Sequence, residues 1–95
     1  MISVSVEENE DTRIKILGHA EKSEVCHAVS GLFYALLGYL KESGCIFKKC
    51  RVLEGNSEII FNGKAKEALK MFRCGIEIIG EKYREDLILA KEFAE

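Results

Sequence analysis

A histidine and a cysteine that lie close together in the chain are the residues best suited to chemistry. His19 stands in the segment Gly18-His19-Ala20, and six residues separate it from Cys26. An imidazole can take up and return a proton, and a thiolate is a strong nucleophile, so the two can share the steps of covalent catalysis. Because the loop between them is short, the fold must bring both side chains to the same corner. The pair predicts a nucleophile at Cys26 with His19 as its proton-transfer partner.

The residues after this loop have the pattern of an amphipathic helix. Apolar residues recur at helical spacing from Val25 to Leu40, which predicts a helix over about 23 to 43. Ser23 is the expected N-cap, and Gly44 can end the helix in a left-handed conformation. Cys26 then lies in the first turn, where unpaired N–H groups and the helix dipole favour a thiolate over a thiol. The same N–H groups could hold the oxyanion of a tetrahedral intermediate.

Other interpretations of these residues stay open. A cysteine on an amphipathic helix is usually a small packed hydrophobe. His27 is a second candidate base, although adjacent helical residues point about 100° apart, so it should face away from Cys26. A zinc site built from Cys26, His19 and Cys45 is conceivable. Against it, Cys45 and Cys50 lack the two-residue spacing of a zinc ribbon or a redox pair.

The rest of the sequence predicts the elements that must position this corner. Alternating apolar residues predict strands over 2 to 6 and 14 to 18, and two more follow over 46 to 53 and 57 to 62. Gly63 then opens a second helix, and residues 87 to 91 could extend it or form a last strand. We therefore expect an α+β fold in one domain, residues 1–95. A mixed four- to five-stranded sheet should carry both helices on one face, in the order ββαββα(β).

Two details of packing are also expected. Gly31 and Gly38 lie inside the first helix, where each costs roughly 1 kcal/mol relative to alanine, which suggests close packing against the sheet. Leu17, Phe47 and Ile60 are expected on the open face of the sheet. Large apolar residues on an open face would indicate a partner surface.

Composition limits the classes of function. The net charge is −2, which argues against a nucleic-acid binder held by phosphate contacts, because such a binder needs a basic face. The sequence has no run of about 18 apolar residues that would predict a membrane span, and its N-terminus does not resemble a signal peptide. These observations predict a cytoplasmic protein with no membrane contact. Its four cysteines are then expected to be free.

Two motifs resemble those of a known family. Gly18-His19-Ala20 is followed by an acidic residue two positions before a cysteine, Glu24, and then by Cys26-His27-Ala28-Val29-Ser30. This pattern resembles the ribosomal-processing cysteine protease family, Prp, and the later segment Gly75 to Ile79 looks similar as well. The chain departs from the family pattern in two places: the loop between His19 and Cys26 is shorter, and His27 replaces an alanine.

The resemblance implies a function, a partner and a set of site residues. It implies a Cys/His endopeptidase, without a cofactor, that removes the N-terminal extension of a bacterial large-subunit ribosomal protein. It also implies a homodimer whose substrate is the ribosomal protein precursor. By position, Cys26 matches the nucleophile and His19 the catalytic histidine, with supporting roles at Gly18, Ala20, Glu24 and Ser30. The alternatives are a non-catalytic dimeric module of ribosome assembly, in which Cys26 is packed, and a thiol redox sensor.

Overall fold

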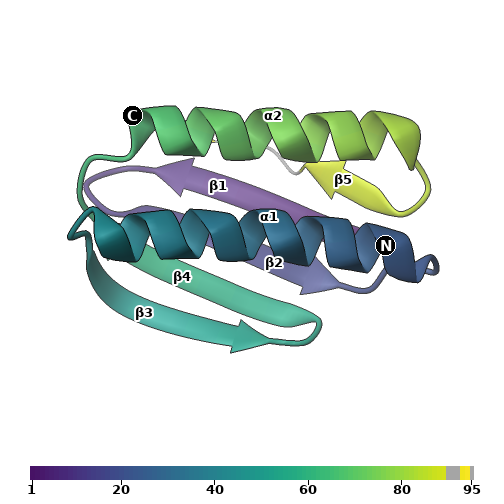
Figure 1. Cartoon of the computed structure of the whole chain (residues 1–95), viewed down its shortest axis with the longest axis horizontal. Helices are drawn as coiled ribbons and strands as arrows, with labels where there is room; N and C mark the ends of the chain where they lie inside the picture. The colour runs from purple at the N-terminus through teal and green to yellow at the C-terminus, as the bar shows by residue number, and fades with distance from the viewer. Residues whose placement is uncertain (90–92, 95) are drawn as a thin grey trace.

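The computed structural model of the chain describes residues 1–89 and 93–94, and Figure 1 shows their arrangement. The elements follow one another as β1 (Ile2–Glu8), β2 (Thr12–Gly18), α1 (Ser23–Glu42), β3 (Ile46–Leu53), β4 (Asn56–Asn62), α2 (Lys66–Lys82), β5 (Leu87–Leu89) and β6 (Phe93–Ala94). Neither helix is long and apolar enough to cross a membrane, as far as the described residues go.

The strands form one mixed sheet in the order β3-β4-β2-β1-β5, and β6 also pairs with β1. The pairs β1–β2, β2–β4 and β3–β4 are antiparallel, whereas β1 and β5 are parallel. Both helices cover the same face of this sheet (Figure 1). The expected α+β class and element order are therefore confirmed. Residues 87 to 89 form a strand, and residues 90 and 91 of the ambiguous segment lie outside the described residues.

The core lies between the helices and the sheet. Each helix buries one stripe of apolar residues, and buried residues alternate with outward-facing ones along the strands, as the period-2 pattern predicts. Apolar side chains from the two layers therefore interdigitate. Fully buried members of this core include Val4, Val6, Ile14, Val25, Leu40, Ile59, Phe61, Phe72 and Ile76.

The helix ends differ in detail from the expectation. Lys22, not Ser23, is the N-cap of α1, and no side chain caps the helix there. Ser23 is already helical, because the Lys22 carbonyl accepts the Val25 N–H at 3.1 Å. Gly63 does not open α2, since its φ of +144° is not helical and the helix begins at Lys66. Gly44, with φ +76°, follows α1 as expected.

The glycine that permits close packing is in α2 rather than α1. A Cβ on Gly31 or Gly38 would meet nothing within 4 Å, so the expected close approach to the sheet is wrong. A Cβ on Gly75 would lie 2.6 Å from Leu32 Cδ2. The close contact is thus between the two helices. The spacing of residues within α1 could not predict it, because it depends on a residue of α2.

The open face of the sheet carries charge as well as apolar residues. Phe47 is not on this face, because a β-bulge between Phe47 and Lys49 shifts the alternation of β3 and turns Phe47 toward Phe61, at 6.1 Å between ring centroids. Glu58, only 5% exposed, lies on the open face instead. Its carboxylate meets Lys49 at 2.6 Å and Arg13 at 3.2 Å. The hydrogen bond from Lys49 holds the pKa of Glu58 below its usual value, so the carboxylate is ionised at neutral pH.

Candidate active site

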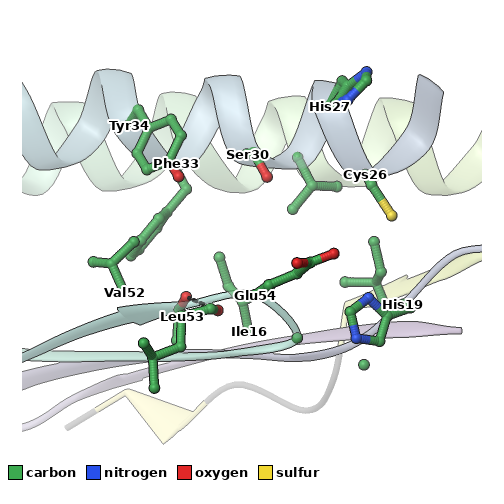
Figure 2. A pocket seen from close by; sticks show the side chains of 15 residues that line it. Ile16, His19, Cys26, His27, Ser30, Phe33, Tyr34, Val52, Leu53 and Glu54 are labelled. Carbon is green, nitrogen blue, oxygen red and sulfur yellow. Dashed lines mark hydrogen bonds between the residues drawn. The ribbon is translucent and has the colours of Figure 1, made fainter. Parts of the chain in front are cut away.

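A cavity of about 370 Å³ lies between the N-terminal half of α1 and the sheet (Figure 2). Four segments of the chain form its walls. They are the start of β1, the end of β2 with the following residue, one face of α1, and the β3–β4 hairpin near its tip. The lining residues are Ile2, Ile16, Gly18, His19, Cys26, His27, Val29, Ser30, Phe33, Tyr34, Val52, Leu53, Glu54, Gly55 and Ser57.

The cavity brings together the two residues that could do chemistry. Cys26 projects its sulfur from α1 toward the sheet, and the His19 ring lies below it at the same end of the cavity (Figure 2). His19 is exposed, whereas Cys26 is half-buried and packs partly against the core. The thiol thus opens into a space that a peptide could enter, with an imidazole at its side.

The backbone of the short loop contacts the Cys26 sulfur directly. The Ala20 N–H donates a hydrogen bond to Sγ at 3.4 Å, and the Cys26 thiol donates one to the Ala20 carbonyl at 3.9 Å. Cys26 is in the first turns of α1, close to the positive end of the helix dipole. A donated N–H and the helix end both stabilise negative charge on sulfur.

The loop that carries His19 is tied down at both ends. Gly18, with φ +93°, donates its N–H to the Gly55 carbonyl at 3.0 Å. Glu21 donates its N–H to Asp86 Oδ1 at 3.3 Å, and Asp86 is only 7% exposed. The loop therefore rests on the β3–β4 hairpin and on the segment after α2. Sequence reasoning missed Asp86, because nothing in its neighbourhood signals a contact 65 residues away.

The hairpin tip supports the imidazole itself. A Cβ built on Gly55 would lie 2.4 Å from His19 Nε2 and 2.9 Å from Cε1. Gly55 also has φ +74°, which side chains rarely adopt. The segment Glu54-Gly55-Asn56 was expected as a turn, and it is one, but its position against His19 could not be read from the turn residues.

The other expected site residues divide into three groups. Gly18 and Ser30 line the cavity with the pair, whereas Ala20 contributes through its backbone. Glu24 is not among the lining residues. Its carboxylate accepts a hydrogen bond from the Tyr83 hydroxyl at 3.2 Å, which joins the start of α1 to the end of α2.

His27 and Cys45 do not join the candidate pair. His27 contributes to the rim of the cavity, but its ring points away from the sheet, on the other side of α1 from the Cys26 sulfur (Figure 2). Cys45 lies beyond the C-terminal end of α1, where its N–H donates to the Leu40 carbonyl at 3.1 Å. Cys26 and Cys45 thus lie at opposite ends of α1, so the three residues of the zinc alternative do not come together. Within residues 1–89 and 93–94 no three histidine, cysteine or acidic side chains are grouped to hold a metal ion.

The fold is shared with solved structures of a processing protease. Two crystal structures of the essential ribosomal processing protease Prp from S. aureus superpose over nearly the whole chain. The structure with a covalently linked product peptide has a TM-score of 0.77 at 20% identity, covering 94% of this chain and 97% of that chain. The structure with a substrate peptide has a TM-score of 0.79 at 18% identity, with 95% and 98% covered. No protein-family model and no curated protein sequence matches this chain. At this identity the likeness establishes a common fold.

We expect iodoacetamide at neutral pH to modify Cys26 before the other cysteines. Cys50 and Cys74 are exposed and Cys26 is half-buried, so accessibility alone would give the opposite order. The hydrogen bond from Ala20 and the start of α1 should reverse it, because the thiolate is the reactive form. Peptide mapping after brief alkylation measures the order. Earlier labelling of Cys50 or Cys74 would contradict the assignment of Cys26 as nucleophile.

Proposed function

We propose that this chain is a cysteine endopeptidase that removes the N-terminal extension of a large-subunit ribosomal protein. The observation that carries the proposal is the position of Cys26 and His19 at one end of an open cavity, at the start of α1. The fold supports it, because the same architecture belongs to a ribosomal processing protease that was solved with peptides bound. The motif resemblance around the same two residues points to the same activity.

The proposed reaction uses Cys26 and His19 in two steps. The Cys26 thiolate attacks the scissile carbonyl carbon, and first-turn N–H groups of α1 stabilise the oxyanion. The imidazolium of His19 gives its proton to the leaving amine as the C–N bond breaks, which leaves a thioester on Cys26. Neutral His19 then takes a proton from water, and the hydroxide attacks the thioester. The thiolate and the imidazolium are restored, and no cofactor is consumed.

The supporting residues act in different ways in this proposal. Ser30 lies one helical turn after Cys26 on the cavity side and can contact the bound peptide (Figure 2). Gly18 and Ala20 position the His19 loop through their backbone groups. Glu24 acts at a distance, since its hydrogen bond with Tyr83 holds the start of α1 against α2.

Incubation of the purified protein with the ribosomal protein precursor tests the proposal. Under reducing conditions we expect a single cut that removes the N-terminal extension, seen as a loss of mass by intact-protein mass spectrometry. An unprocessed precursor, with the protein shown to be folded, would favour the non-catalytic assembly module instead. Reversible oxidation of Cys26 by peroxide without any proteolysis would favour the redox sensor.

We also expect a homodimer, acting in the cytoplasm where its ribosomal substrate is made. The strand registers place Leu53, Leu17 and Ile88 in one row across the open face of the sheet, at 59%, 40% and 49% exposure. A second copy could cover this row. Sedimentation equilibrium at micromolar concentration should give twice the chain mass of 10.7 kDa. A mass near 10.7 kDa at every concentration would contradict the dimer.

A further inference from the structure

Glu54 places a carboxylate in the middle of the cavity. It lies at the tip of the β3–β4 hairpin, is exposed, and points its carboxylate into the space between α1 and the sheet (Figure 2). Of the described residues that line the cavity, Glu54 is the only one with a carboxylate, and none is lysine or arginine. A carboxylate in this position is available to a cation supplied from outside.

The cations of the same hairpin are engaged elsewhere. Lys49 and Arg51 both contact Glu58, at 2.6 Å and 3.4 Å, on the open face of the sheet. The bulge in β3 turns these two side chains away from the helices, so neither lies on the side of the sheet to which Glu54, in the turn after β3, points (Figure 2). The hairpin thus neutralises one glutamate and leaves the other exposed to the cavity.

A bound peptide would have to pass this carboxylate. Cys26 and His19 lie at one end of the cavity, whereas Phe33 and Val52 form an apolar wall at the other end (Figure 2). Glu54 lies between the two ends. A peptide whose carbonyl reaches Cys26 and whose apolar side chains reach Phe33 would therefore bring a neighbouring side chain beside Glu54.

We propose that Glu54 is a specificity-determining residue, selecting peptides that carry a lysine or arginine within a few residues of the scissile bond. The inference rests on the proposed peptidase function and adds the charge of the substrate to it. The apolar wall accepts uncharged side chains, and the carboxylate discriminates between positive and negative ones. Because the cavity is open, the charge should change substrate preference without being needed for the chemical step.

Matched peptides measure this preference. Each set contains lysine, norleucine or glutamate at one position, scanned over three residues on either side of the cleavage site. At the best position we expect kcat/KM to be about tenfold higher for lysine than for glutamate. The Glu54 carboxylate attracts the lysine side chain weakly and repels the glutamate side chain to a similar extent. The Glu54→Gln variant should lower that ratio to about twofold, and Glu54→Lys should invert it. Raising the ionic strength should reduce the ratio in the wild-type protein.

A control variant and a binding assay keep the two proposals separate. Glu42→Gln removes the same charge at the exposed C-terminal end of α1 and should leave the ratio unchanged. Fluorescence anisotropy with the Cys26→Ser variant measures binding of the same peptides without turnover. Cleavage with equal rates for lysine and glutamate at every position would overturn the role of Glu54 while the peptidase stands. The wild-type protein could instead bind the lysine peptide selectively without cleaving any peptide, and Glu54→Gln could abolish that selectivity. This result would support the role of Glu54 in selectivity and overturn the peptidase function. Absence of both selective cleavage and selective binding would overturn the role of Glu54.

Discussion

Replacing Cys26 with serine will abolish cleavage of the ribosomal protein precursor, lowering the rate by at least about a thousandfold. The hydroxyl is far less acidic than the thiol, so neither the hydrogen bond from Ala20 nor the start of α1 can produce a comparable nucleophile. The change in volume is small, and the variant should fold normally. Processing of the precursor by purified protein measures the loss, with circular dichroism as the check on folding.

The two neighbouring histidines provide the control for the same experiment. His19→Ala should cost at least about a hundredfold in rate, the lower end for a lost general acid–base group. His27→Ala should cost much less, because its ring points away from the sulfur (Figure 2). The difference between the variants separates the two imidazoles by geometry. An active His19→Ala protein beside an inactive His27→Ala protein would show that the pair is wrongly assigned.

Adding one methyl group at Gly55 will lower activity by about a hundredfold, because a displacement of about 1 Å in a catalytic group can have that effect. In Gly55→Ala the new Cβ would lie 2.4 Å from His19 Nε2, so the imidazole must move away from its present position. The backbone at φ +74° adds strain of about 1 kcal/mol. Steady-state cleavage and urea denaturation measure the two effects separately.

Gly44 offers a matched control for the strain. Its φ is +76°, but a Cβ there would meet nothing within 4 Å. Gly44→Ala should therefore lose a similar stability of about 1 kcal/mol and keep its activity. Gly55→Asn is a further check, since asparagine tolerates this backbone conformation and still carries the Cβ. If Gly55→Ala and Gly55→Asn were as active as Gly44→Ala, the hairpin would have no part in positioning His19.

Local patterns alone determined most of the fold. The alternation in β1 and β2, the helical spacing from Val25 to Leu40 and the turn at Gly55 each depend on residues a few positions apart, so the sequence displays them directly. The proximity of His19 and Cys26 in space also follows from a short stretch of sequence, because only six residues separate them. This is why the class of fold and the candidate pair could be predicted together.

The tertiary structure decided what surrounds that pair. The pairing of β2 with β4 brings the hairpin tip to the His19 loop, which places Gly55 against the imidazole and Glu54 in the cavity. Asp86 reaches the same loop from beyond α2. A single bulge in β3 sends Phe47 to the core and Lys49 to the open face. These positions depend on strand register and on contacts between distant segments. Periodicity in one segment carries no information about its register with another, and so the sequence could indicate the candidate pair but not the walls of the cavity around it.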